Sequence, residues 1–189
     1  TILTAVVLSP SPMQAAVQPV PPKASDLPLP VIERFENFGK EVGIPTAKVH
    51  CVLKTSEGRL WIGTNGGLAY WQDGRFVALT NKDGLADNFV ISLHEDADGV
   101  LWIGTYDSGL SRWQHGRFTN YTVAQGLFSN GVFSIVEDRG NNFWLSSSRG
   151  ISRVSRQQLN EVAAGKLKTV NAVAYGKQDG LLLAQGNAG

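Results

Sequence analysis

The chain contains a five-residue segment, Leu60 to Thr64, in which both sides of an extended strand are apolar or small. Side chains alternate along a strand, so Leu60 and Ile62 share one side while Trp61 and Gly63 share the other. A strand with one wet face would alternate apolar and polar residues instead. The pattern therefore predicts a strand that is buried on both faces. The same five residues return at positions 101–105.

Short strand-like runs surround the second copy of this segment. They are separated by turns rich in glycine, aspartate and asparagine, which tolerate the positive φ of tight turns. The predicted strands are 76–80, 89–96, 100–105 and 110–114. Because helical periodicity is absent from this stretch, we expect the four strands to form one antiparallel meander.

Three kinds of landmark residue recur along the chain at the same two intervals. Successive members of each set are separated by 41 and then 42 positions, an agreement that chance explains poorly. The sets are Trp61, Trp102 and Trp144; Phe35, Phe76 and Phe118; and Gly43, Gly84 and Gly126. These intervals predict repeat units at 35–75, 76–117 and 118–155.

A four-stranded antiparallel meander that repeats roughly every 40–50 residues is typical of a β-propeller blade. We therefore predict an all-β fold with three four-stranded blades and, from the Asp-Gly-Leu turn at 179–181, the start of a fourth. Propellers close with about 4–8 blades, so these blades predict an incomplete ring, either part of a longer protein or completed by another copy. The structural residues expected between blades are three tryptophan wedges and two glycines that give the neighbouring backbone room: Trp61, Trp102, Trp144, Gly63 and Gly104.

The stretch DGRFVALTNKDGLADNFVISLHEDADGVLWIGTYDSGLSRW closely resembles the two-component regulator propeller repeat. Its matching features are the aromatic-x-x-x-Thr strand, the Asp-Gly-Leu turn, the Glu-Asp-x-x-Gly hairpin and the Leu-Trp-Ile-Gly-Thr strand. The resemblance covers residues 35–189. It weakens in the third unit, where Trp144-Leu145-Ser146-Ser147 replaces Trp-Ile-Gly-Thr and Asn141-Asn142 adds one residue to the hairpin.

The resemblance implies a non-catalytic extracytoplasmic sensing domain of a bacterial signal-transduction protein. In that family the propeller precedes a transmembrane helix and a histidine kinase or diguanylate cyclase output domain, and it binds a ligand or dimerises to switch the output. One alternative is a propeller enzyme similar to streptogramin lyases, whose repeats look related. The other is a protein-interaction scaffold.

The ends of the repeat region have their own patterns. Residues 1–17 resemble an export signal without its start, with a buried strand as the alternative, and 18–34 form a proline-rich linker. Residues 155–167 predict one helix, which begins at a Ser155–Gln158 capping box, shares Leu159, Val162 and Ala163 on one face and ends at Gly165. From the export-like segment 1–17 and the family resemblance, we expect a periplasmic or extracytoplasmic location.

The composition excludes several classes of partner. Lys and Arg number 17 against 16 Asp and Glu, so the net charge of +1 offers no basic surface for nucleic acid. The single Cys51 allows no internal disulfide, and no later segment is apolar enough to cross a membrane, so membrane attachment falls to segments outside this chain. We expect an unidentified small molecule or glycan as ligand, and homodimerisation through the propeller as a further contact.

The sequence shows no catalytic or metal-binding constellation. No nucleophile–base motif or phosphate-binding loop is present, and the three histidines occupy unrelated positions. The paired acids Glu95-Asp96 and Glu137-Asp138 precede hairpin turns, where an aspartate normally accepts backbone N–H bonds. We therefore expect no catalytic residue, no metal and no cofactor.

Loops on one face of the blades are the candidate ligand site. Because successive strands alternate direction, the turns before the first strand and between the second and third emerge on the same face. Loops on a rigid scaffold are where binding residues concentrate, although ordinary turn residues are the simpler interpretation. Tyr106 and Asp107 lead the candidates, and the others are Asn65, Asp83, Asn88 and Asn130.

Overall fold

The computed structural model describes residues 42–46, 48–176 and 179–180, and within them it forms three antiparallel sheets of four strands each. The first sheet has the order β1 (Val49–Lys54), β2 (Leu60–Thr64), β3 (Gly67–Gln72) and β4 (Arg75–Leu79). The second has the order β5 (Val90–Glu95), β6 (Leu101–Thr105), β7 (Leu110–Gln114) and β8 (Arg117–Tyr121). Short 3-10 helices, η3 (Asn81–Asp83) and η4 (Val123–Gln125), lead out of these two sheets.

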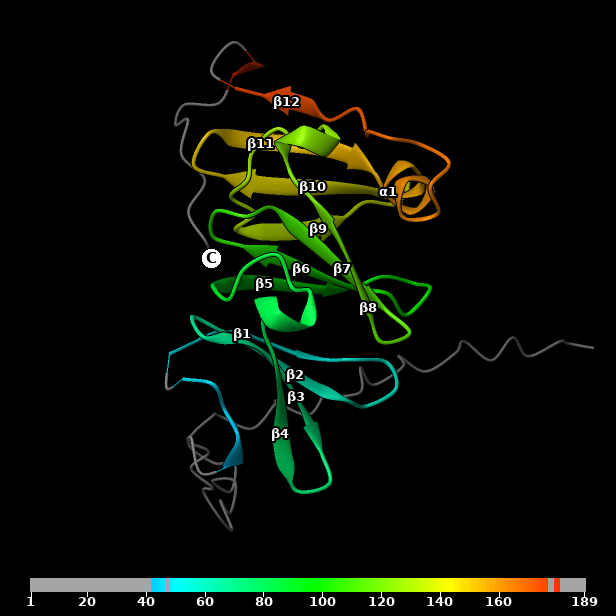
Figure 1. Cartoon of the computed structure of the whole chain (residues 1–189). Helices are drawn as coiled ribbons and strands as arrows, with labels where there is room; N and C mark the ends of the chain where they lie inside the picture. The colour runs from blue at the N-terminus through cyan, green and yellow to red at the C-terminus, as the bar shows by residue number, and fades with distance from the viewer. Residues whose placement is uncertain (1–41, 47, 177–178, 181–189) are drawn as a thin grey trace, which may run out of the picture. The chain divides into compact units, whose positions relative to one another are not determined.

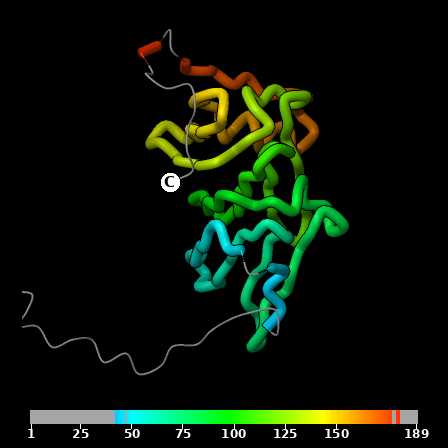
Figure 2. The backbone as a smooth tube through the Cα atoms, turned by 90° about the vertical axis from the view of Figure 1, so that its left-hand side faces the viewer, coloured from blue at the N-terminus to red at the C-terminus, as the bar shows by residue number. Residues whose placement is uncertain are grey.

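The third sheet contains an insertion. Its strands are β9 (Ser134–Glu137), β10 (Asn142–Ser147), β11 (Gly150–Ser155) and β12 (Val173–Tyr175), and α1 (Arg156–Ala163) lies between β11 and β12. The sheets follow one another in chain order, with β5 beside β1 and β9 beside β5 (Figures 1 and 2). The predicted all-β fold of four-stranded blades in an unclosed ring is confirmed.

The sheets are out of phase with the sequence repeat by one strand. The prediction placed 76–80 in the same meander as 89–96, 100–105 and 110–114, and this was wrong. Strand β4 pairs with β3 in the first sheet, because the two-residue turn Asp73-Gly74 folds it directly back. Strand β8 completes the second sheet in the same way. The blades therefore do not coincide with the units 35–75, 76–117 and 118–155.

Helix α1 occupies the predicted stretch but is shorter at its C-terminal end. Ser155 is the N-cap and accepts the Gln158 N–H at 3.4 Å. The reciprocal half of the predicted capping box does not form, because the Gln158 side chain instead accepts the Asn171 N–H. Leu159 is fully buried against the core, and Gly165 follows the helix with a positive φ of 71°.

The predicted tryptophan wedges fill the spaces between successive sheets. Trp61 is 3% exposed and lies in one cluster with Leu101 and Ile103 of the second sheet. Trp102 is fully buried and packs edge-on against Phe143 of the third sheet, with ring centroids 4.9 Å apart. Because the opposite face of β2 carries Ile62 into a separate cluster, this strand is buried on both faces as predicted.

Gly63 and Gly104 lie where the following sheet comes too close to leave room for a Cβ. A Cβ on Gly63 would collide with the Val90 side chain, and one on Gly104 would collide with the carbonyl oxygen of Val132. Val90 and Val132 lie at the starts of the following sheets. The absence of a side chain at Gly63 on β2 and at Gly104 on β6 therefore determines how closely the next sheet can pack.

The third sheet presents the equivalent tryptophan face without a further described sheet against it. Trp144 is half-buried and stacks on Tyr175 at 5.1 Å. On the same side of the sheet, Val136 is 58% exposed and Val173 is 42% exposed. Ser146 stands where the first two sheets have Gly63 and Gly104.

An aspartate closes the hairpin before each of the later tryptophans. Asp96 accepts the N–H groups of Asp98 and Val100 and the indole N–H of Trp102 at 2.8 Å. Asp138 accepts the N–H of Asn142 and the indole N–H of Trp144 at 2.9 Å. These bonds agree with the interpretation of both aspartates as turn residues.

Several sequence predictions concern residues that the structure does not describe. The export-like segment 1–17 and the linker 18–34 lie outside the described residues, as does most of the fourth repeat. The turn that begins this repeat is present at Asp179-Gly180, where Asp179 accepts the Gly176 N–H at 2.8 Å. Within the described ranges, no helix has the length and apolar character needed to span a membrane.

Replacing Gly104 by alanine should destabilise the fold by about 2 kcal/mol, because the added Cβ meets the Val132 backbone, which has little freedom to move. Gly58→Ala is the matched control. Its Cβ would enter open space, so it costs only the left-handed φ, about 1 kcal/mol. Urea unfolding followed by tryptophan fluorescence measures both, and equal losses would contradict the close-approach argument.

Hydrogen bonds from the Asn142 N–H and the Trp144 indole lower the pKa of Asp138 from 3.8 to about 2. Because the folded pKa is depressed, this contribution to stability is present above about pH 3.8 and is lost as the pH falls toward 2. The difference in unfolding free energy between the native protein and Asp138→Asn should therefore shrink between pH 5 and pH 2, measured by urea titration. A difference independent of pH would refute the assignment.

Candidate functional site

One face of the molecule carries the turns that join the second and third strands of each sheet. A hydroxyl side chain holds each turn in the same way: Thr64, Thr105 and Ser147 donate to the carbonyls of Gly67, Gly109 and Gly150. The same oxygens accept an N–H from within the turn. The three turns therefore have one backbone scaffold.

The tips of these turns differ from sheet to sheet. The first turn carries Asn65-Gly66, the second Tyr106-Asp107-Ser108 and the third Ser148-Arg149. Since the scaffold is the same and the tips are not, the tips are positioned to determine what this face binds.

The 3-10 helices on the same face account for two of the predicted candidates. Asp83 forms a capping box with Thr80 and accepts its N–H at 2.8 Å. The Asn88 side-chain oxygen accepts the Asn81 N–H at 2.8 Å. Both side chains therefore stabilise the turn of η3, which is the simpler interpretation considered for them.

Three of the predicted residues meet at one recess between the second and third sheets. Its volume is about 330 Å³, and Tyr106, Asp107 and Asn130 all line it. The remaining lining residues are Val123, Ser129, Gly131, Phe133, Ser148 and Arg149. Asn130 also supports η4, because its side-chain oxygen accepts the Val123 N–H at 3.0 Å. Its amide N–H₂ has no protein partner within the described residues.

Tyr106 belongs to a column of rings that runs across all three sheets. His50 on β1 lies 4.9 Å from Phe89, Phe89 stacks on Tyr106 at 5.0 Å, and Tyr106 stacks on Phe133 at 5.8 Å. The Tyr106 side chain nevertheless remains 53% exposed. The column thus fixes the ring in place between two others while leaving the edge of the side chain open to solvent.

The structure separates the other candidates from this recess and adds residues that sequence reasoning missed. Asn65 hydrogen-bonds with Thr46, and neither Asn65, Asp83 nor Asn88 lines the recess. Phe133 and Arg149 were not predicted. The sequence shows that Arg149 occupies the turn equivalent to Tyr106-Asp107 in the third repeat, but not that the two turns lie side by side.

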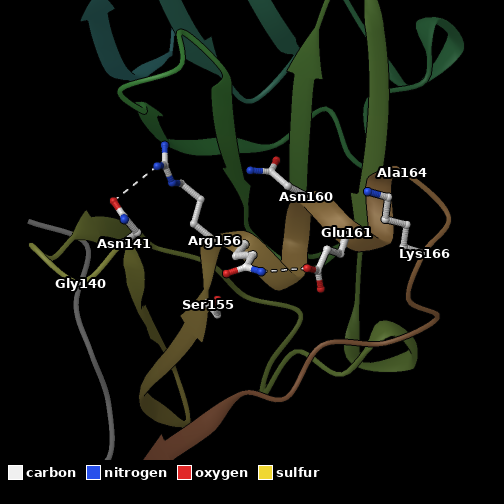
Figure 3. Close-up of a pocket in the computed structure, with 9 residues that line it drawn as sticks. Gly140, Asn141, Ser155, Arg156, Asn160, Glu161, Ala164 and Lys166 are labelled. Atoms are coloured by element: carbon white, nitrogen blue, oxygen red, sulfur yellow. Dashed lines mark hydrogen bonds between the residues drawn. The ribbon is translucent and has the colours of Figure 1, made fainter.

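A second polar recess, of 350 Å³, lies between the β9–β10 hairpin and α1 (Figure 3). Arg156 Nη2 donates to Asn141 Oδ1 at 3.4 Å, and Gln157 Nε2 donates to Glu161 Oε1 at 2.9 Å. Its side chains are largely bonded to one another. This arrangement secures α1 to the hairpin, and it leaves fewer free groups than the Tyr106 recess.

Next to this recess, a charged cluster joins the second and third sheets. The Arg156 guanidinium lies 3.3 Å from Asp96, 3.0 Å from Asp98 and 3.2 Å from Glu137. Glu137 also contacts His94 Nε2 at 3.1 Å. Because each carboxylate already has a cationic or N–H partner, the cluster acts as a clamp between sheets.

The described residues offer no metal centre, since no group of three or more His, Cys, Asp or Glu side chains converges there. Burial raises the pKa of the Cys51 thiol to about 12. The thiol is therefore protonated at neutral pH and is a poor nucleophile.

Comparison with known proteins agrees with this architecture. The family model described as "Two component regulator propeller" matches residues 43–66 and 84–107. Each match runs from the glycine of one turn through the tryptophan strand to the tip of the next turn. No curated protein matched the chain.

Solved structures of low sequence identity share the fold. The extracellular domain of BT3049 from B. thetaiotaomicron, assigned to a hybrid two component system, aligns with a TM-score of 0.67 and 21% identity over 79% of this chain and 21% of its own. The extracellular domain of BT4673 from the same organism aligns with a TM-score of 0.53 and 21% identity, over 61% of this chain and 18% of its own. An inactive virginiamycin B lyase from Staphylococcus aureus, solved with quinupristin, aligns with a TM-score of 0.51 and 16% identity, over 72% of this chain and 44% of its own. The chain thus spans about one fifth of the length of the first two.

Proposed function

Because the chain carries two-component regulator propeller repeats at 43–66 and 84–107, we propose that it is a ligand-binding sensory domain of a bacterial signal-transduction protein. The observation that carries this proposal is the recess at Tyr106, where an exposed ring and several uncommitted polar groups come together on loops of a rigid scaffold. The ligand is a small molecule or a glycan.

The domain itself is non-catalytic in this proposal. Asp107 is the one carboxylate in the recess lining, and no histidine, cysteine or lysine accompanies it there. The hydroxyl of Ser129 accepts the Gly131 N–H at 3.1 Å and so serves the turn. These residues can pack against, hydrogen-bond to and orient a ligand, but they include no nucleophile with an adjacent base.

The proposed location is extracytoplasmic. The two structural neighbours from B. thetaiotaomicron are extracellular domains, which supports a periplasmic or other extracytoplasmic position. A longer parent protein would connect the propeller through a membrane segment to a histidine kinase or a diguanylate cyclase. Dimerisation of the propeller is the proposed means by which ligand binding reaches that output.

Tyr106→Ala should weaken ligand binding about tenfold or more, because it removes the exposed aromatic edge that a ligand in the recess would contact. Tyr106→Phe keeps the ring and should lose only a few-fold, whereas Asp107→Ala should weaken ligands that donate hydrogen bonds. Isothermal titration of the chain against a glycan and metabolite panel identifies the ligand and measures each variant.

Glu57→Ala is the matched control, since Glu57 is exposed in the β1–β2 turn and does not line the recess. Thermal melting shows whether each variant is folded. Ligand binding that is unchanged in both folded Tyr106 and Asp107 variants would place the site elsewhere and contradict this proposal.

A further inference from the structure

Arg149 occupies the tip of the third turn and lines the same recess as Tyr106. Its backbone is fixed, because its N–H donates to Ser147 Oγ at 3.2 Å and the same hydroxyl donates to Gly150. The residue therefore starts from a defined point at the rim of the recess, even though its side chain is exposed.

Two contacts with Phe128 hold the guanidinium. Arg149 Nη1 donates to the Phe128 carbonyl at 2.8 Å, and the guanidinium carbon lies 4.5 Å from the centroid of the Phe128 ring. Stacking and the hydrogen bond together restrain a side chain that would otherwise sample many rotamers. Only one of the five N–H donors is used in these contacts.

Neither partner neutralises the charge. Arg149 forms no ion pair with any carboxylate that the structure describes, Asp107 included. Arg156, by contrast, is surrounded by three carboxylates within 3.3 Å where it joins two sheets. An arginine that is immobilised, uncompensated and at the edge of a recess is suited to a ligand that brings its own negative charge.

Two neighbouring groups define the rest of that ligand. Tyr106 is 53% exposed although its ring stacks between Phe89 and Phe133, so it offers a ligand its exposed edge, which suits contact with an apolar or ring-shaped group. Asp107 carries a negative charge on the same lining, so it repels a second anionic group and favours hydroxyl or other hydrogen-bond donors there.

We infer that the ligand of this site carries a carboxylate that pairs with Arg149 and a ring that packs against the exposed edge of Tyr106. This inference rests on the proposed ligand-binding function and adds a ligand class and a specificity-determining residue to it. A planar guanidinium accepts a carboxylate through two parallel N–H···O bonds, which distinguishes an acid from its neutral counterpart. Two sources share this chemistry, an acidic sugar and an aromatic acid.

Matched pairs of probes that differ in the carboxylate test the inference directly. D-glucuronate is compared with D-glucose, and benzoate with benzyl alcohol, by NMR titration of the 189-residue chain. At least one acid should bind about tenfold or more tightly than its neutral partner. The advantage should fall as salt is raised, because the pair is exposed to solvent. The pair with the larger advantage identifies the source.

Variants of the arginine separate charge from shape. Arg149→Gln should remove the preference for the acid while leaving the neutral partner's weak binding unchanged, and Arg149→Lys should retain part of it. Arg139→Gln, at an exposed hairpin position outside the recess, is the control and should keep the full preference. Thermal melting confirms that the variants are folded.

The outcomes distinguish this inference from the proposed function. Equal binding of acid and neutral members that is lost in Tyr106→Ala overturns the inference and leaves the proposed function standing. A preference for acids that survives in Arg149→Gln also overturns the inference. Absence of binding by all four probes overturns the inference alone, because the proposed function is decided by the panel titration with the Tyr106 and Asp107 variants.

Discussion

The fold depends on how closely each sheet can approach the next. Gly63 and Gly104 remove the side chains at the contact, and Trp61 and Trp102 fill the space beside it. A strand with this composition has no solvent-facing side, so a single sheet exposes a large apolar surface that the following sheet covers. Cohesion between sheets, rather than within any one of them, therefore holds the array together.

The same constraint explains why variation concentrates at the turns. Side chains on the strands are needed for packing between sheets. The hydroxyl of Thr64, Thr105 or Ser147 then holds the backbone at the end of the second strand of each sheet. Side chains beyond that hydroxyl contribute little to the core. They are therefore free to differ, and the structure places an aromatic, an acid and a base from two successive turns, Tyr106, Asp107 and Arg149, around one recess.

The fold could be predicted largely because the repeat is marked by tryptophan and glycine, whose roles in a strand are few. Tryptophan in an apolar run and glycine beside it predict packing between sheets, and Trp61 and Trp102 do lie buried between successive sheets. The strand at which each blade begins could not be predicted, because a 42-residue repeat can be divided at any point. Only the Asp73-Gly74 hairpin shows that β4 pairs within the first sheet.

The last strand and part of the site were missed for different reasons. β12 follows an insertion that contains α1, so its residues fall outside the period, yet Tyr175 stacks on Trp144 much as Tyr121 approaches Trp102. Arg149 stands in a turn that is one residue shorter than that of Tyr106, and sequence alone does not show that the two turns are neighbours across a sheet boundary. Proximity of this kind depends on the angle between sheets.

The ring column that includes Tyr106 has a mechanical consequence. His50, Phe89 and Phe133 belong to three successive sheets or to the segments that enter them, and their rings overlap face to face or at a tilt. A rotation of one sheet relative to the next would slide these rings over one another. Because Tyr106 contacts Phe89 on one side and Phe133 on the other, a displacement at either of these contacts would change the position of its ring.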